Sequence, residues 1–196
     1  MENTILKMYI TLSAPIIAGC LNMIWCKSNI LKKYNTPMDC NKNFIDGKRI
    51  FGDNKTWKGF LGYIILNVLC SILLGEIWKI NNLNEMNYFY SQLPNTICSN
   101  LVIGILLGLG YSIFELPNSF LKRRLNIEPG ETASGIKKIF FIFLDQADSV
   151  IGCCTVLSLF YQMTFGFYIM YILLGAFTHI VFNMVLYFLG LRKNMF

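Results

Sequence analysis

Five long apolar segments, separated by polar stretches, dominate the pattern of residues along the chain. They run from Ile5 to Trp25, Gly59 to Trp78, Ile97 to Leu116, Ile139 to Phe160 and Phe167 to Leu191. About 20 helical residues cross the ~30 Å hydrocarbon core of a bilayer, and each segment reaches that length. An open sheet in lipid would leave backbone groups unpaired. The pattern therefore predicts an all-α integral membrane protein with five transmembrane helices, forming a single transmembrane domain over residues 1–196.

The composition supports a membrane location. Of the 196 residues, 55% are hydrophobic and 14% are charged, against about 25% charged residues in a typical soluble domain. A soluble fold would have to hide too much apolar surface. The seven cysteines are odd in number and include no CxxC pair, so the sequence predicts neither a disulfide framework nor a zinc site.

The basic residues predict how the helices are oriented. Fifteen of the 17 lysines and arginines fall in residues 26–58, in residues 117–138, or at the C-terminus as Arg192 and Lys193. The connections on the other side hold almost none. The positive-inside rule places the basic side in the cytoplasm. We therefore expect an N-terminus outside, a cytoplasmic C-terminus, and cytoplasmic loops at about 26–58 and 117–138.

Two aspartates interrupt the fourth apolar segment. Asp145 and Asp148 are spaced i, i+3, so both side chains lie on one face of a helix. A carboxylate inside the bilayer costs at least about 2.5–3.5 kcal/mol on insertion scales, which makes a functional role the favoured interpretation. A buried structural pair neutralised by Lys or Arg is the alternative.

Further polar residues fall in the same cytoplasmic half of the predicted bundle. Glu115 ends the third segment, and Asn22 lies near the cytoplasmic end of the first. His179 and Asn183 are spaced i, i+4 on the fifth, so they share a helix face. These two could equally be hydrogen-bonding contacts between helices.

Two basic motifs flank these acids. One is Ser119-Phe-Leu-Lys122-Arg123-Arg124, which by itself could be only a topology signal. The other is Phe51-Gly52-Asp53-Asn54-Lys55-Thr56-Trp57-Lys58-Gly59, where glycine, lysine and threonine suit a backbone that wraps phosphate oxygens. It is not the Walker pattern, and an ordinary loop with a helix cap is the alternative. Acids on one face beside basic motifs predict a metal ion and a polyphosphate.

Four stretches in order resemble the CDP-archaeol synthase family, relatives of the phosphatidate cytidylyltransferases (CDP-diglyceride synthases). The first runs from Pro37-Met-Asp39 to Gly59, and the second is the S-x-x-K-R motif at Ser119. The third is Leu144-Asp145-Gln146-Ala147-Asp148, similar to the family's D-Q-x-D. The fourth is His179 with Asn183, Tyr187 and Gly190-Leu191-Arg192. The resemblance spans nearly the whole chain.

The resemblance implies a membrane cytidylyltransferase that transfers CMP from CTP to a phosphorylated lipid, giving a CDP-lipid and pyrophosphate. It implies Mg²⁺ or another divalent cation, held by Asp145 and Asp148 with Glu115. Lys122 and Arg123 would join the two aspartates as catalytic residues. The nucleotide and lipid phosphate would be bound by the remaining motif residues: Asp53, Lys55, Thr56, Ser119, Arg124, His179 and Asn183.

The family resemblance leaves several points open. Archaeol phosphate, phosphatidate and a prenyl or glycolipid phosphate all remain possible lipid substrates, and the oligomeric state is not readable. We expect CTP, the lipid and the bilayer as partners, no nucleic acid, and an active site facing the cytoplasm from the cell membrane. A small membrane transporter, which also explains intramembrane acids, and a non-catalytic membrane protein are the alternatives.

Overall fold

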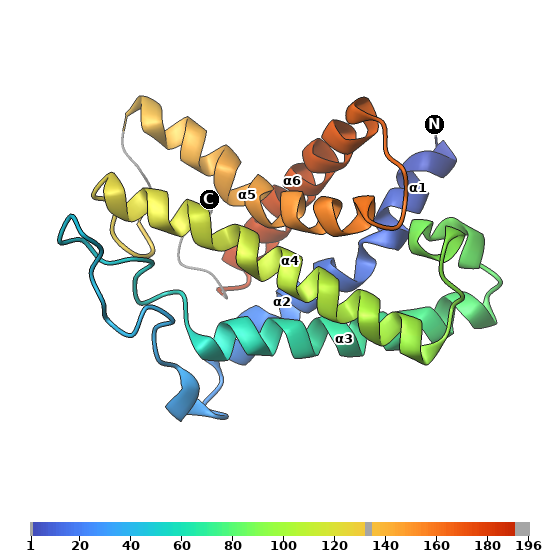
Figure 1. Ribbon diagram of the computed structural model, residues 1–196, viewed down its shortest axis with the longest axis horizontal. Coiled ribbons are helices and arrows are strands. Elements are labelled where there is room, and N and C mark those ends of the chain that lie inside the picture. Colours follow the sequence, from blue (N-terminus) through green and yellow to red (C-terminus); the bar gives the residue numbers. More distant parts are fainter. Residues whose placement is uncertain (1, 132–134, 191–196) are drawn as a thin grey trace.

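The computed structural model describes residues 2–131 and 135–190, and within these ranges the protein is helical with no strand. Short 3₁₀ turns and two isolated bridges, Pro37 with Thr56 and Asn43 with Arg49, shape the connections. The predicted C-terminal positions Leu191, Arg192 and Lys193 lie outside the described residues. The helices are α1 (Glu2–Thr11), α2 (Ser13–Lys27), α3 (Trp57–Ile80), α4 (Ile97–Arg124), α5 (Ile136–Ser158) and α6 (Phe165–Phe188) (Figure 1).

Four of these helices are each long and apolar enough to span a membrane, and the α1–α2 pair makes a fifth span if it is counted as one. The prediction of a helical membrane protein is therefore confirmed, but the first span is not the single helix that was expected. It bends by 47° between α1 and α2. Pro15 explains the break, because it has no N–H to donate to the carbonyl of Thr11 and its ring crowds that turn.

Helix α4 is longer than the apolar pattern predicted. It runs through Pro117 and ends only at Arg124, so the Ser119–Arg124 motif lies on a helix rather than in a loop. A proline inside a membrane helix is tolerated when neighbouring groups satisfy the freed backbone carbonyl. The expected 117–138 loop is thus helical over its first eight positions, and α5 begins at Ile136.

Helix α4 packs between α3 and α5 through glycines (Figure 1). A Cβ added at Gly104 would lie 2.6 Å from Cα of Val68, and one at Gly108 would lie 2.9 Å from Cα of Ile64, both on α3. On the α5 side, Gly110 and Gly152 face each other so closely that a Cβ on either would meet the other's backbone. Small residues that let helix backbones approach are typical of membrane helix packing.

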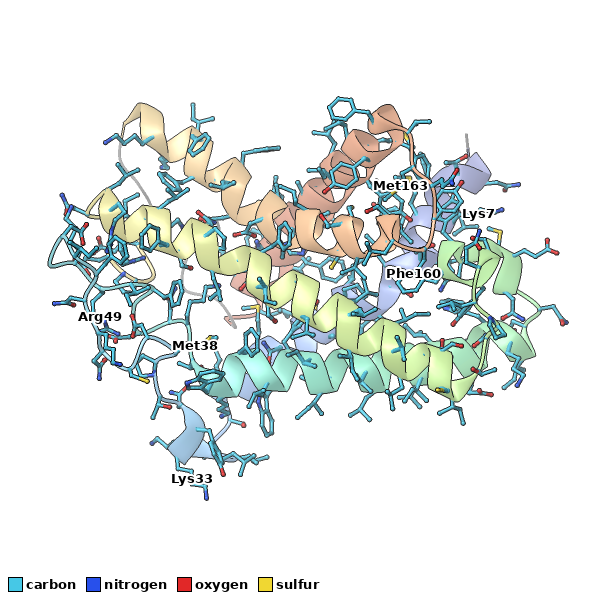
Figure 2. The ribbon with its side chains drawn as sticks, in the orientation of Figure 1. Lys7, Lys33, Met38, Arg49, Phe160 and Met163 are labelled. Atoms are coloured by element: carbon cyan, nitrogen blue, oxygen red, sulfur yellow. The ribbon has the colours of Figure 1, made fainter. Side chains whose placement is uncertain are left out.

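The connections gather at the two ends of the molecule. The α2–α3 loop (residues 28–56), the last turn of α4 and the start of α5 lie at one end, at the left of Figure 1. The N-terminus, residues 81–96 and the 159–164 turn lie at the other end. Figure 2 labels Lys33 and Arg49 at the first end and Lys7 and Phe160 at the second. The basic motifs of the sequence therefore share one end of the bundle, while the membrane orientation stays a prediction.

All seven cysteines are free thiols. Cys70, Cys153 and Cys154 are buried within the helical core, whereas Cys40 and Cys98 are exposed. Most of them lie in the helices, and Cys26 near the end of α2 lines the main cavity of the site described next.

Candidate active site

One amide on α4 joins the two aspartates of α5. Nδ2 of Asn118 donates to Oδ1 of Asp145 over 2.8 Å and to Oδ2 of Asp148 over 2.7 Å. The second oxygen of Asp148 accepts from the backbone N–H of Ser149 over 2.6 Å. Asp148 is buried, with 8% of the residue exposed. The i, i+3 spacing therefore does bring both carboxylates to one place, against α4 and not against lipid.

Lys122 adds a positive charge to the same place. Its Nζ lies 2.6 Å from Oδ2 of Asp145 and stands over the ring of Phe141, 5.7 Å from the ring centroid. Lys122 follows Asn118 by four residues, so one face of α4 presents both an amide and an ammonium group to the acids. Asp145 is thereby held by two donors from α4.

A cavity of about 490 Å³ opens beside Asp145. Its wall combines residues from the α2–α3 loop with polar residues of α2, α4, α5 and α6. The polar lining includes most of the predicted site residues, namely Asn22, Asp53, Lys55, Thr56, Glu115, Asp145, His179 and Asn183. Since α3 contributes Gly59, Phe60 and Tyr63 as well, five helices and one loop converge on one space.

The loop is tied to this cavity by an ion pair between Lys55 and Glu115. Burial acts to lower the pKa of Lys55, but the carboxylates of Glu115 and Asp148 outweigh it and hold that pKa above its ordinary value. Thr56 caps α3, since its Oγ1 accepts from the N–H of Gly59 over 3.1 Å. Lys55 therefore stays cationic in the cavity, at a position fixed by the start of α3.

Helix α6 supplies another part of the wall through His179 and Asn183. Nδ2 of Asn183 donates to Oε1 of Gln146, the residue after Asp145, over 2.6 Å. The His179 ring lies 6.0 Å from the Tyr111 ring, which in turn stacks on Tyr63 with 4.0 Å between ring centroids. Both residues line the cavity, so the contacts between helices are shown for this pair, and a binding role stays a prediction.

The three consecutive basic residues do not act together. Arg124 forms an ion pair of 3.0 Å with Asp46, donates to the backbone oxygen of Arg49 and packs on Phe44 and Phe120. Arg123 lines a second, smaller cavity and not the main one. Only Lys122 reaches the aspartates, and Ser119 is buried without lining either cavity. The structure therefore does not bring Ser119, Arg123 and Arg124 together around one cavity, as the shared role in binding phosphates would require.

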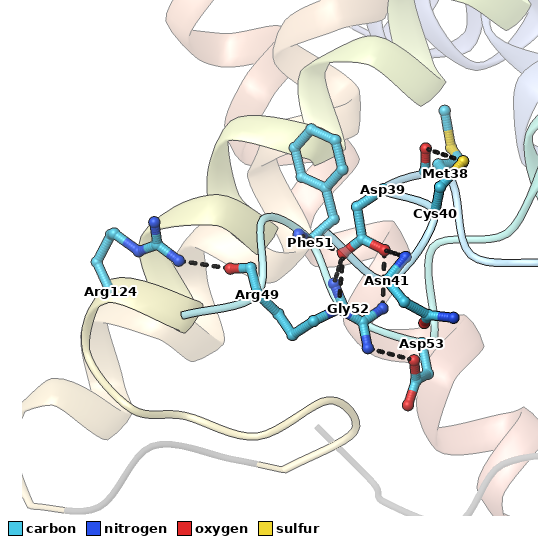
Figure 3. A network of polar contacts seen from close by, with 9 residues as sticks. All are labelled: Met38, Asp39, Cys40, Asn41, Arg49, Phe51, Gly52, Asp53 and Arg124. Atoms are coloured by element: carbon cyan, nitrogen blue, oxygen red, sulfur yellow. Dashed lines mark hydrogen bonds and ion pairs between the residues drawn. The ribbon is translucent and has the colours of Figure 1, made fainter. Parts of the chain in front are cut away.

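Asp39 organises the α2–α3 loop, as Figure 3 shows. Its carboxylate accepts from the guanidinium of Arg49 over 2.7 and 3.2 Å and from the backbone N–H groups of Asn41, Phe51 and Gly52. Burial acts to raise the pKa of Asp39, but the bonds from Arg49 and from these N–H groups hold it well below its usual range. Arg49 also pairs with Asp53 at 2.9 Å, which places Asp53 between the two cavities.

Sequence reasoning assigned no role to Asn118 or Asp39 as site residues. The i, i+4 spacing of Asn118 and Lys122 was the available signal, since it puts both on one face of a helix. It was hidden because the segment was expected to be a loop. For Asp39 the signal was weaker, because its partners depend on how the loop folds.

The charges fit a single divalent cation held by two carboxylates. Within residues 2–131 and 135–190, no three His, Cys, Asp or Glu side chains come close enough to form a metal cluster. Asp145 and Asp148 do converge, because both reach the same amide nitrogen. Mg²⁺ is commonly held by one or two carboxylates, its remaining ligands being water and substrate phosphates. The two aspartates alone could hold such an ion, and metal binding by them, with or without Glu115, stays a prediction.

Comparisons with known proteins agree with this arrangement. A family model described as CarS-like CDP-archaeol synthase matches residues 5–196. The chain belongs to this family. CDP-archaeol synthases are membrane CTP-dependent cytidylyltransferases, so the resemblance seen in the four motifs is confirmed.

Individual CDP-archaeol synthases match over most of their length. That of Methanocaldococcus jannaschii is 30% identical over 157 residues, covering 80% of this chain and 81% of the relative. That of Staphylothermus marinus is 32% identical over 201 residues, covering 96% and 90%. A solved structure described as an intramembrane enzyme for archaeal membrane lipid biosynthesis aligns with a TM-score of 0.63 at 24% identity, covering 92% of this chain and 94% of that one. It shows the same fold.

Proposed function

We propose that the protein transfers CMP from CTP to the phosphate of a membrane lipid, giving a CDP-lipid and pyrophosphate. One observation carries the proposal. Asp145 and Asp148 are joined by Asn118, Lys122 pairs with Asp145, and the cavity beside Asp145 is also lined by Lys55. Paired acids suit a divalent cation, and lysines suit the charge of a triphosphate.

The reaction needs little covalent work from the protein. An oxygen of the lipid phosphate attacks the α-phosphorus of CTP, and the bond from that phosphorus to the oxygen of the β-phosphate breaks. The electron pair leaves with pyrophosphate, and no general base is required because the attacking phosphate is already an anion. Positioning and charge stabilisation dominate in such transfers.

The side chains divide this work by position. Asp145 and Asp148 would hold the divalent cation, which when bound polarises the phosphate oxygens and offsets their charge. Lys122 and Lys55 would neutralise the phosphates, and Asn118 would keep the two carboxylates facing each other. Asp53, Thr56, His179 and Asn183 line the cavity and would contact the nucleotide.

The lipid would reach this cavity from the bilayer between α2 and α6. A groove of about 90 Å³ lies there, lined by apolar residues such as Ile16, Phe182 and Leu186. It shares Tyr111 and His179 with the main cavity, so the two are adjacent. Acyl or isoprenoid chains would remain in the groove while the head group meets CTP.

The surroundings of the site suggest where CTP arrives. The basic loops and the cavity share one end of the bundle, and the positive-inside rule puts that end in the cytoplasm. We therefore place the N-terminus outside and the active site at the cytoplasmic face of the cell membrane. The relatives' names make archaeol phosphate the first lipid to test.

The test is a direct assay with purified protein. Labelled CTP, Mg²⁺ and single lipids (archaeol phosphate, phosphatidate or a prenyl phosphate) are supplied in turn, and the CDP-lipid and pyrophosphate are measured. Equal amounts of both products with one lipid, and none without lipid, are expected. A protein that binds CTP but forms no CDP-lipid with any of them would exclude the transferase and favour a transporter or a non-catalytic protein.

A further inference from the structure

A second cavity lies beside the active site and is not used by the proposed reaction. It measures about 220 Å³, against roughly 30 Å³ for one water in the liquid. The α2–α3 loop supplies one wall through residues 48–53, and the end of α4 with the following turn supplies the other through residues 123–129. The cavity is thus built from two segments that are distant in sequence.

The guanidinium of Arg123 is the notable group in this cavity. Only 6% of Arg123 is exposed, and its Nε and Nη1 are buried without a hydrogen-bond partner among residues 2–131 and 135–190. A guanidinium is always charged and has five N–H donors to satisfy. A buried charge without a partner is costly, so these donors call for an anion.

Glu128, Asp53 and Glu131 attract this charge from nearby, but within the described residues none of them forms an ion pair with it. Asp53 is paired with Arg49, and the ion pairs found in the described part of the chain include none between Arg123 and Glu128. Lys48 donates from Nζ to the backbone oxygen of Arg124 over 2.8 Å. Three basic and two acidic side chains line the cavity, which leaves its wall with a net positive charge.

The backbone keeps space beside this guanidinium. Gly52 has a φ of +99°, a conformation that side-chain-bearing residues rarely adopt. A Cβ at this position would lie 2.7 Å from Cγ of Pro129 and 3.6 Å from Nε of Arg123. Only glycine therefore lets the loop come this close to the turn and to the guanidinium.

We propose that this second cavity binds a phosphate-type oxyanion through the guanidinium of Arg123. Planar guanidinium groups match phosphate oxygens in pairs, which suits Arg better than Lys here. Asp53 lines both cavities, so an anion formed in the first needs to travel only past this residue. Pyrophosphate released by cytidylyl transfer would be the natural occupant; that identification rests on the proposed function, whereas the anion site does not.

Equilibrium binding of radiolabelled inorganic pyrophosphate tests the site without CTP, lipid substrate or metal. The protein is held in nanodiscs of zwitterionic lipid with EDTA present. The wild type should bind pyrophosphate, and Arg123→Gln should weaken binding by about tenfold or more, since a bidentate charged contact is lost. Lys33→Gln is the control for loss of a positive charge, because Lys33 is an exposed lysine of the α2–α3 loop that lines neither cavity. It should leave the affinity unchanged.

A variant that should bind more tightly distinguishes loss of the anion site from loss of the fold. Glu128→Gln removes an acid from the wall and should tighten binding by about threefold, a result that an unfolded protein cannot give. A loss in Lys122→Gln but not in Arg123→Gln would place the anion in the main cavity and overturn the proposal, as would wild-type protein that binds no pyrophosphate.

Nanodiscs of anionic phospholipid separate the two sources of phosphate. Unchanged binding is expected there, and displacement would assign the site to a lipid head group instead of a free anion.

Because the binding assay contains no substrate, its failure is separate from failure of the transferase assay. A protein that forms CDP-lipid but binds pyrophosphate equally with and without Arg123 keeps the proposed function and loses this site. A protein that forms no CDP-lipid but binds pyrophosphate through Arg123 keeps the site and loses the proposed function.

Discussion

Lys55 and Glu115 form an ion pair across 60 residues of sequence, joining the α2–α3 loop to α4 at the wall of the main cavity. Lys55 thereby compensates an acid that would otherwise add to the negative charge of Asp145 and Asp148. Lys55→Gln should raise the KM for CTP by roughly tenfold, because loss of a charged contact is worth more than about 1.4 kcal/mol. Steady-state kinetics at several CTP concentrations measure this, with Lys32→Gln, an exposed lysine of the same loop, as the control.

The double variant Lys55→Gln with Glu115→Gln separates two roles for the glutamate. If its partner is Lys55, removing both charges restores part of the CTP affinity, and the two substitutions are not additive. We expect this rescue. A double variant that is worse than Lys55→Gln alone and needs more Mg²⁺ would instead make Glu115 a metal ligand.

Asn118 should govern how well the acid pair binds a cation. Its single amide nitrogen holds both carboxylates, and Asn118→Ala would let them turn apart. Loss of a residue that orients metal ligands typically lowers metal affinity about 10–100-fold. Titration of turnover with Mg²⁺ and with Mn²⁺ should show this shift. Asn81→Ala, at the exposed end of α3, should show none, and an unshifted Asn118→Ala curve would remove the orienting role.

Asp148→Asn should abolish CDP-lipid formation while the protein remains folded. The substitution keeps the shape of the side chain but removes the charge that would hold a cation, and a loss of at least about a hundredfold in kcat is expected. Thermal unfolding in detergent, compared with the wild type, checks that the fold survives. Near wild-type turnover in a correctly folded Asp148→Asn protein would contradict the metal assignment.

Asp39 should hold the α2–α3 loop together at acid pH. Its pKa is lowered in the folded protein, so its contribution to stability is complete above the unfolded value of about 3.9 and is lost as the pH falls towards the folded value. Asp39→Asn should remove about 3 kcal/mol of loop stability, since it leaves Arg49 with only the exposed Asp53 as an ionic partner and weakens the bonds from the backbone N–H groups. Pepsin at pH 4 should then cut the loop in Asp39→Asn but not in the wild type.

A matched control for this loop is Asp46→Asn. Asp46 pairs with Arg124, but its side chain is 37% exposed, and exposed ion pairs contribute little. Its cleavage by pepsin should stay close to that of the wild type. Equal protection of Asp39→Asn would show that the loop is held by its packing on α4 and not by the Asp39 network.

The apolar pattern was enough to predict the helices, because crossing a bilayer requires long runs that few other folds contain. It missed the bend before α2, since a proline near one end of an apolar run changes direction without changing hydropathy. It also ended α4 too early at Pro117, although membrane helices tolerate proline.

The acid pair was predictable because the i, i+3 spacing is a property of one helix. The roles of the basic residues were not predictable, because each of the three has a different neighbour in the folded protein. Consecutive helical residues point about 100° apart, and so Lys122, Arg123 and Arg124 face Asp145, the second cavity and the α2–α3 loop respectively. Three consecutive residues thus face three different parts of the structure. The partners of Asp39 required the folded loop, which no spacing reveals.

The backbones of Gly110 on α4 and Gly152 on α5 lie in close contact. Gly152 follows Asp148 by about one helical turn, so this contact lies next to the acid pair. Because Asn118 and Asp148 sit on these two helices, any spreading at the glycines would be transmitted as a wider gap between amide and carboxylates. A methyl group at either glycine would therefore be expected to separate the amide from the acid pair, although neither glycine lines the main cavity.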